Sequence, residues 1–503
     1  MCVVACSTCR SAVNPLLVVI DSGPLIGHMR PGSREFLGIP FAAPPLGPLR
    51  FRAPAPVVRW STPRDATSRG PACPQPKTND VIRQTDEDCL NLNVWVPDGG
   101  GERLPVLVWL HGGGYYSGSG ADGLYDGALL ATEAKAIVVT VNYRLGPLGF
   151  LSHRALAKEA NVPVSASMGI LDQRAALAWV QRNIAAFGGA PEQVTLFGES
   201  AGAASVCTHL ASPKSLGLFS RAIMQSGACS DAFYFDGAAA EAQGDALADA
   251  VGCTGPQTLE CLRGKSANEL VSALPIKRGL LLRPGIWWGP VADGIELPTL
   301  PLTALRRGAF AKVPLIIGWN RDEGMLFTHA LKEVSGSELK GFLADVFGAA
   351  AAAAVPSRYP REPPKDSLAA VVTDGIFACN ARRVARVVAK QNVPVFLYEF
   401  SHPLDDPRPH SFGATHTVEL WFVFGNADLG VGLSDAERPL SQSVMQAWGR
   451  FARGGNPSGG AFGWPRYTLA GDQQLIIDTQ PSIGSHLKQA ECDLWDSFST
   501  EPG

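Results

Sequence analysis

The chain has 503 residues, with 43 lysines and arginines against 46 aspartates and glutamates, for a formal net charge of −3. This balance gives no electrostatic reason to expect nucleic acid or an anionic membrane as a partner. Hydrophobic residues make up 46% of the chain and charged residues 18%, which excludes a disordered or fibrous protein and indicates a globular one with a large core.

The domain organisation is predicted from the N-terminal residues and from the lack of linkers. Residues 1–14 have neither the basic nor the apolar region of a secretory signal, so we expect a disordered tail. No charged or serine-rich linker interrupts the remaining sequence, and we expect one domain over 15–503. Because no apolar run reaches the ~18 residues that span a bilayer, we expect no membrane span.

Short apolar runs rich in β-branched residues predict buried strands. In chain order these runs are 105–110, 137–141, 194–197, 314–317 and 395–398. They are apolar on both faces, which suits a parallel sheet covered by helices. Between the second and third runs, apolar residues recur at helical spacing over 169–187, and Gly188-Gly189 ends this helix. A strand, a helix and a strand form the crossover unit of a parallel sheet, so we expect an α/β protein.

The first motif with chemical meaning is Gly198-Glu199-Ser200-Ala201-Gly202, which fits Gly-x-Ser-x-Gly directly after the predicted strand 194–197. Glycines on both sides of a serine allow a sharp turn between a strand and a helix, which holds the serine hydroxyl exposed at the sheet edge. The N-terminus of the following helix then lies close to the negative charge that develops during acyl transfer. Ser200 is therefore a candidate nucleophile.

A second motif, His111-Gly112-Gly113-Gly114, follows the predicted strand 105–110. Glycine amides can approach a substrate oxygen because no side chain intervenes. With the amide of Ala201, the amides of Gly113 and Gly114 would form an oxyanion hole, in which each donor is typically worth a factor of about 10² to 10³ in rate.

Few other patterns indicate a metal or nucleotide site. Cys6 and Cys9 have the spacing of a zinc knuckle, but no second cysteine pair follows them. Residues 118–123 satisfy Gly-x-Gly-x-x-Gly, yet they do not follow a predicted strand as a dinucleotide-binding turn does. We therefore expect no metal and no cofactor.

Beyond these motifs, a series of stretches in order along the chain resembles the type B carboxylesterases of the α/β-hydrolase fold, the family that includes bacterial para-nitrobenzyl esterases and the cholinesterases. The matching stretches are 36–42, 44–51, 87–95, 142–144 and 172–173. The resemblance covers nearly everything after residue 15. It implies a large, mostly parallel central sheet flanked by helices, with helical excursions that form an active-site gorge.

The resemblance also implies the partners of the serine. The acid of the family lies in a segment similar to 320–324, which selects Glu323, and its base lies in a segment similar to 413–416, which selects His416. The order Ser200, Glu323, His416 is the order of nucleophile, acid and base in this fold. The histidine must be neutral to take the serine proton, and the carboxylate orients its ring.

This chain departs from the family at Thr417, because the residue after the base is usually glycine. The departure puts the local backbone in question and leaves the base unchanged. Weaker alternatives stay open for the base, at His402 and His410, and for the acid, at Asp322, Asp405 and Asp406.

Further implications of the resemblance concern structure around the site. It implies disulfides Cys73–Cys89 and Cys253–Cys261, a buried ion pair of Arg50 with Glu87, and a hydrogen bond from the Ser226 hydroxyl to the acid. Glu199, next to Ser200, is expected to support the site from behind the reacting groups. Tyr115 is expected to contact the substrate because it lies beside the predicted oxyanion loop.

The expected function is hydrolysis of carboxylic esters through an acyl-enzyme, on small to medium aryl or alkyl esters. A lid-gated lipase and a non-catalytic adhesion protein are the alternatives. The segment between Cys73 and Cys89 lacks tryptophan, which argues against a choline ester. The expected partner is a small-molecule ester, for a monomer or a homodimer. The implied disulfides favour a secreted or periplasmic location and leave a cytoplasmic one open. The lack of Asn-x-Ser/Thr acceptors, with x other than proline, favours a bacterial source.

Overall fold

The computed structural model describes residues 14–76, 84–99, 101, 103–164, 166–230, 233–275, 286–329, 331, 333–361, 363–406, 412–426 and 431–498. The predicted disordered tail, apart from its last residue Asn14, lies outside the described residues, as does His410.

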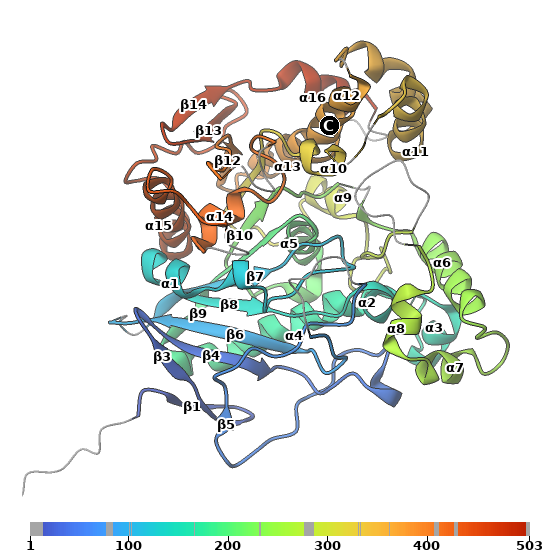
Figure 1. Cartoon of the computed structure of the whole chain (residues 1–503), viewed down its shortest axis with the longest axis vertical. Helices are drawn as coiled ribbons and strands as arrows, with labels where there is room; N and C mark the ends of the chain where they lie inside the picture. The colour runs from blue at the N-terminus through green and yellow to red at the C-terminus, as the bar shows by residue number, and fades with distance from the viewer. Residues whose placement is uncertain are drawn as a thin grey trace, which may run out of the picture.

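The described residues form two sheets (Figure 1), one of eleven strands in the order β14-β13-β12-β11-β10-β9-β7-β8-β6-β4-β3 and a small one in the order β1-β2-β5. The strands are β1 (Leu17–Ile20), β2 (Gly23–Ile26), β3 (His28–Arg30), β4 (Ser33–Pro40), β5 (Arg64–Asp65), β6 (Asn91–Pro97), β7 (Leu104–Leu110), β8 (Ile137–Val141), β9 (Gly189–Glu199), β10 (Arg221–Gln225), β11 (Leu315–Asn320), β12 (Val395–Phe400), β13 (Gln473–Ile477) and β14 (Ser482–Ser485).

The helices lie in the connections between these strands and beyond the last of them. They are α1 (Ala128–Ala134), α2 (Gly146–Phe150), α3 (Arg154–Ala160), α4 (Met168–Asn183), α5 (Ala201–Ala211), α6 (Gly237–Ala250), α7 (Thr258–Gly264), α8 (Ala267–Ser272), α9 (Pro301–Arg306), α10 (Gly324–Thr328), α11 (Gly336–Ala354), α12 (Pro364–Val372), α13 (Cys379–Lys390), α14 (Glu419–Phe424), α15 (Arg438–Gly454) and α16 (Gln489–Ser497).

The central part of the large sheet is parallel, as the apolar runs predict. The five predicted strands correspond to β7, β8, β9, β11 and β12, and the predicted helix corresponds to α4 and the 3₁₀ turn Ile184–Phe187 that follows it. Antiparallel pairs occur at both edges, β8 with β6, β6 with β4 and β4 with β3 on one side, and β13 with β14 on the other. The apolar-run criterion missed β6 and β10 because polar residues, such as Asn91 and Gln225, lie within them.

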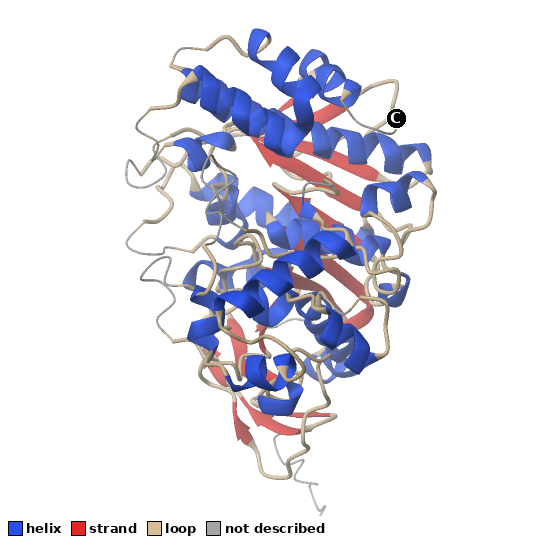
Figure 2. Ribbon diagram, turned by 90° about the vertical axis from the view of Figure 1, so that its right-hand side faces the viewer, coloured by secondary structure: helices blue, strands red, loops and turns tan. Residues whose placement is uncertain are grey.

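Each face of the sheet has its own hydrophobic core. Successive side chains of β7 alternate between the two cores, since Val108 belongs to one and Trp109 to the other. α4 and α5 pack on the first face, whereas α1 and α15 pack on the second. Figure 2 shows strands running between helices, so the sheet is buried on both sides.

Both implied disulfides, Cys73–Cys89 and Cys253–Cys261, are present. The structure adds Cys207–Cys229, which ties α5 to the segment after β10, and Cys379–Cys492, which ties α13 to α16. The other three cysteines, Cys2, Cys6 and Cys9, lie outside the described residues.

The implied ion pair is also present, since Arg50 Nε donates to Glu87 Oε2 at 2.8 Å.

One described helix, Gly336–Ser357, is long and apolar enough by length and composition to cross a membrane, with a mean hydropathy of 1.4. The backbone at Gly348 is not helical, with φ 85° and ψ 169°, and it divides α11 into two pieces. Neither piece alone approaches the ~20 residues that a span needs. The expectation of no membrane span stays a prediction.

Candidate active site

The candidate site lies at one edge of the sheet, where the carboxyl ends of the parallel strands meet. β7, β9, β10, β11 and β12 are parallel neighbours, so their carboxyl ends lie on the same side (Figure 1). The segments that follow β7, β9, β11 and β12 carry Gly113 and Gly114, Ser200, Glu323 and His416. Ligand sites of open parallel sheets form at this edge, where loops from several strands converge.

Ser200 lies on a strained turn between β9 and α5. Its backbone has φ 55° and ψ −120°, and its amide donates to the carbonyl of Gln225 at 3.0 Å. The turn needs glycine beside it, because a Cβ at Gly202 would lie 2.0 Å from the carbonyl oxygen of Leu110. The close approach of α5 to β7 therefore explains the second glycine of the motif.

Three backbone amides surround this turn without an acceptor. Within the part of the chain that the structure describes, the N–H groups of Gly113, Gly114 and Ala201 donate no hydrogen bond. Gly113 and Gly114 have φ 101° and 59°, a conformation that suits glycine. Ala201 is the first residue of α5, where an amide has no partner inside the helix. These amides are free to bind an oxyanion.

His416 and Glu323 form a buried pair. Nδ1 of His416 lies 2.6 Å from Oε2 of Glu323, whose side chain is fully buried. The other oxygen, Oε1 of Glu323, accepts the backbone N–H of Asn320 at 2.8 Å. An ionised carboxylate only accepts, so the proton of the pair belongs to Nδ1 and the remaining nitrogen, Nε2, faces away from Glu323. The rings of Phe327 and Phe377 lie 5.0 and 4.8 Å from the imidazole and exclude water from it.

The second nitrogen of His416 faces Glu199, the residue before the serine. Nε2 lies 3.0 Å from Glu199 Oε1, a contact whose angle does not make a hydrogen bond. The Ser200 hydroxyl makes no hydrogen bond to any described residue. The imidazole therefore lies between two carboxylates and makes no hydrogen bond to Ser200.

These carboxylates change the acidity of the histidine. Burial lowers the pKa of His416, but the charges of Glu199 and Glu323 more than offset burial and raise the pKa to about 9. Burial has the opposite effect on a carboxyl group, and it raises the pKa of Glu199 well above its ordinary value. The charged form of His416 is therefore favoured by its two carboxylate neighbours.

Replacement of Glu199 by glutamine is expected to move the acid limb of kcat/KM to lower pH by roughly one unit. The negative charge of Glu199 stabilises the imidazolium, so its removal lowers the pKa of His416 and leaves more neutral base at low pH. The measurement is kcat/KM against pH for the wild type and Glu199→Gln, with Glu192→Gln, an exposed glutamate on β9, as the control. An unchanged acid limb in Glu199→Gln would contradict this electrostatic assignment.

A third buried carboxylate, Glu419, was missed by the sequence analysis. Oε2 of Glu419 accepts from Asn320 Nδ2 at 2.5 Å, and Oε1 accepts from Gln225 Nε2 at 3.2 Å. Burial and repulsion from Glu323 raise the pKa of Glu419 to about 7. Asn320 therefore connects the two carboxylates, because its backbone binds Glu323 and its side chain binds Glu419. The sequence signal that could have identified Glu419 was its position three residues after His416. This spacing places both residues near the start of α14.

One expected contact differs in the structure. The Ser226 hydroxyl is buried without a hydrogen bond, so the expected bond to the acid is not made. The oxygens of Glu323 bind the amide of Asn320 and His416.

Tyr115 is only 3% exposed, and its hydroxyl accepts from Ser205 Oγ at 3.3 Å. Its ring packs edge-on against Phe150. Little of its surface is therefore open to a substrate, and a substrate contact by Tyr115 stays a prediction.

The alternative acid and base candidates lie elsewhere. Asp322 Oδ2 accepts the N–H of Ala414 at 2.9 Å, so this carboxylate holds the segment before His416 and not its ring. His402 contacts Asp478 and Glu437 on the far side of β12 from this pair. Among the described candidates, the acid and base that touch each other are Glu323 and His416.

The departure at Thr417 is visible in the backbone. Thr417 has φ 76°, in the left-handed region that β-branched residues avoid, which explains why glycine suits this position. The threonine accommodates the turn without displacing His416 from Glu323.

The variant Thr417→Gly is expected to stabilise the protein by about 1 kcal/mol, since relief of ~1–2 kcal/mol of strain exceeds the added chain entropy of glycine. The measurement is the denaturant midpoint and the thermal inactivation rate. Lys135→Gly, at an unbranched residue with φ 50°, is the matched control and should stabilise less. Equal or lower stability in Thr417→Gly would show that the position carries no strain.

Comparison with known proteins identifies the class of protein that this fold and site define. The sequence profile of the Carboxylesterase family matches residues 14–495, so the chain belongs to the carboxylesterase family. It is a carboxylic-ester hydrolase of the serine type with an α/β-hydrolase fold, and small-molecule esters are its substrates. The fold and the family implied by the sequence are thereby confirmed.

Individual relatives cover nearly the whole chain. The para-nitrobenzyl esterase of Bacillus subtilis (strain 168) is 40% identical over 484 residues, which are 93% of this chain and 96% of the relative. The fumonisin B1 esterase of Sphingopyxis macrogoltabida is 38% identical over 507 residues, 94% of this chain and 89% of the relative. The solved structure of a thermophilic PNB esterase aligns with a TM-score of 0.86 at 36% identity, covering 96% of this chain and 100% of that structure.

Proposed function

We propose that Ser200 is the nucleophile of this esterase, His416 its general base and Glu323 the acid that orients the base. Ser200 Oγ attacks the ester carbonyl while its proton passes to His416 Nε2. The oxyanion of the tetrahedral intermediate is bound by the amides of Gly113, Gly114 and Ala201, which are named together here as the oxyanion hole. Collapse of the intermediate releases the alcohol, protonated by His416, and leaves the acyl group on Ser200.

Water then hydrolyses the acyl-enzyme, with His416 acting first as base and then as acid. His416 takes a proton from water as the water attacks the acyl-serine, and it returns this proton to Ser200 Oγ as the acid product leaves. Glu323 keeps the Nδ1–H tautomer and stabilises the imidazolium in both halves of the cycle. Glu199 adds a second negative charge beside the same cation.

One observation carries this proposal. The strained serine and three amides without acceptors lie on turns that the carboxyl ends of adjacent strands β7 and β9 place together. A structural role would leave no reason for buried or half-buried amides to remain unbonded, since such groups are normally satisfied. A serine on a turn of this kind with donors beside it is suited to acyl transfer.

For the substrate we propose small to medium aryl or alkyl esters. The names of the relatives support an ester substrate. One relative is named for para-nitrobenzyl esters and another for fumonisin B1. The rings of Phe327 and Phe377 beside His416 support an apolar acyl or alcohol group near the reacting carbonyl.

The experiment combines a substrate series with covalent labelling. Hydrolysis of para-nitrophenyl esters from acetate to palmitate should show ordinary saturation and an optimum at short to medium chain length. A fluorophosphonate probe should inactivate the enzyme, and mass spectrometry should locate one adduct on Ser200. An adduct on another residue would overturn the assigned nucleophile, whereas a jump in rate above the solubility limit of the ester would favour a lid-gated lipase.

A further inference from the structure

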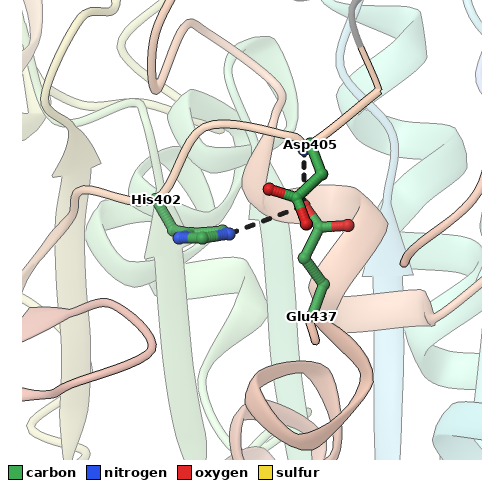
Figure 3. Close-up of side chains that lie close together, drawn as sticks. All are labelled: His402, Asp405 and Glu437. Carbon is green, nitrogen blue, oxygen red and sulfur yellow. Dashed lines mark hydrogen bonds and ion pairs between the residues drawn. The ribbon is translucent and has the colours of Figure 1, made fainter. Parts of the chain in front are cut away.

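A second cluster of ionisable side chains lies outside the active site, where the segment after β12 meets the start of α15. It consists of His402, Asp405 and Glu437, named here the 402–437 cluster. One nitrogen or oxygen from each residue lies within 4.8 Å of those of the other two. Figure 3 shows the ring of His402 and the carboxyl groups of Asp405 and Glu437 converging on one point.

His402 is held in the orientation of a ligand. Its Nδ1 lies 2.9 Å from Asp478 Oδ1, at the end of β13. Because the carboxylate accepts, this contact places a proton on Nδ1 and directs Nε2 toward the cluster. Nε2 is buried and makes no hydrogen bond. A carboxylate behind one nitrogen of a histidine, with the other nitrogen open, is the arrangement that surrounds metal-bound histidines.

Neighbouring backbone and serine groups donate to the two carboxylates, and Ser434 Oγ donates to Asp405 Oδ2 at 2.6 Å. Glu437 is fully buried, and its oxygens accept the amides of Asp405 at 2.8 Å and of Ser434 at 2.7 Å. Among the described residues, no lysine or arginine pairs with Asp405, Glu437 or Asp478. Three carboxylates therefore face one imidazole, and a buried carboxylate without a counter-charge is costly.

Part of this arrangement has a structural explanation. Glu437 precedes the first residue of α15, and its contacts with Ser434 are those of a cap at the start of the helix. A cap accounts for the position of Glu437. The same turn holds Asp405, whose Oδ2 accepts from Ser434 Oγ. The cap does not account for the buried Nε2 of His402, which makes no hydrogen bond.

We propose that the 402–437 cluster binds one divalent transition-metal ion of the zinc class, with His402 Nε2 and one oxygen each from Asp405 and Glu437 as ligands. Nε2 lies 3.5 Å from Glu437 Oε1. Two ligands of a tetrahedral zinc ion are separated by about 3.4 Å, so this pair already has the required spacing. Asp405 is exposed, and closing the site requires a rotation of its side chain, whose Oδ2 accepts from Ser434 Oγ at 2.6 Å in this structure.

The ligand types select the class of ion. An imidazole nitrogen with two carboxylates suits zinc and its neighbours, whereas calcium and magnesium prefer oxygen ligands alone. The ion neutralises the carboxylates and links the segment after β12 to α15. His416 lies further along that same segment, so the ion would also restrain the approach to the catalytic base.

The test measures zinc binding by the full chain. Wild type, stripped with a chelator, is titrated with ZnCl₂ by calorimetry, together with Asp405→Asn, Glu437→Gln and Asp478→Asn. We expect loss of one bound equivalent, or at least tenfold weaker binding, in Asp405→Asn and Glu437→Gln, and about tenfold weaker binding in Asp478→Asn. Zinc should raise the Tm of the wild type and leave that of Asp405→Asn unchanged.

Two comparisons keep the result decisive. His486→Gln removes a histidine that also lies beside an aspartate, at 3.4 Å from Asp472, and should bind zinc as the wild type does. Asp405→Asn alters an exposed side chain and should fold even if Glu437→Gln does not. Zinc binding that is the same in Asp405→Asn as in wild type would overturn the proposal. So would zinc inhibition of the esterase with equal affinity in both proteins, since the ion would then occupy the catalytic residues.

Discussion

Replacement of Ser200 by alanine is expected to lower kcat toward para-nitrophenyl esters by a factor of about 10⁵ to 10⁶. The hydroxyl is the group that bonds to the acyl carbon in the proposed mechanism, and nothing else at the turn can take its place. The amides of Gly113, Gly114 and Ala201 remain in this variant. They should sustain a residual rate of about 10³ to 10⁴ over water, because the oxyanion is still stabilised when the nucleophile is absent.

The measurement is the initial rate with a chromogenic ester, with folding checked by thermal denaturation. Ser443→Ala is a suitable control, since the Ser443 hydroxyl bonds only to the carbonyl of Pro439 on the surface of α15. It should retain the wild-type rate. Retention of more than about a hundredth of the activity by a pure sample of Ser200→Ala would show that another residue is the nucleophile.

The variant Glu323→Gln is expected to lower kcat by about 10³ to 10⁴. The carboxylate accepts the proton of His416 Nδ1 at 2.6 Å, and it has no access to solvent that could replace it. A glutamine amide can present N–H to the ring and favour the other tautomer, in which Nε2 carries the proton and cannot accept one from Ser200. The lost negative charge also destabilises the imidazolium that forms in each half-reaction.

Asp322→Asn provides a matched comparison, because it changes the neighbouring carboxylate in the same way. Asp322 accepts the backbone N–H of Ala414, a role that the oxygen of asparagine can keep. We expect its kcat to stay within about tenfold of the wild type. The pair is assayed under the same conditions with one chromogenic ester. A greater loss in Asp322→Asn than in Glu323→Gln would exchange the roles assigned to these two residues.

The His416 contacts explain why the two largest effects should differ. In the proposed mechanism Ser200 reacts with the substrate, whereas Glu323 acts through the histidine that it positions. Because the imidazole also lies 3.0 Å from Glu199, part of the electrostatic support for the cation survives when Glu323 is neutralised. The double variant Glu199→Gln with Glu323→Gln should therefore lose more activity than either single variant.

The local features of the site were predictable from sequence because they depend on neighbouring residues. The glycines around Ser200 and in 111–114 are required by turns that directly follow apolar strands, so each motif lies within a few positions of the strand that identifies it. The resemblance to the carboxylesterases supplied Glu323 and His416, which spacing alone would not have joined across 93 residues.

The features that were missed depend on which strands are neighbours. Glu419 becomes part of the site because Asn320 and Gln225, at the ends of the adjacent strands β11 and β10, reach it together. The bond expected from Ser226 is not made, and the acid binds Asn320 and His416 instead. Neither the pairing of strands nor the choice of partners for a buried carboxylate can be read from a linear pattern.

The sequence by itself determined the α/β class and the sharp serine turn, because periodicity and glycine placement are properties of consecutive residues. The resemblance of its motifs, in order along the chain, indicated the family and the proposed order of nucleophile, acid and base. Only the tertiary structure decided that His416 rests between Glu323 and Glu199, and that His402 and Glu437 approach to 3.5 Å. These contacts join residues far apart in the sequence, so strand register and helix packing set them. Burial makes each unpaired charge costly, and small displacements change which groups can touch.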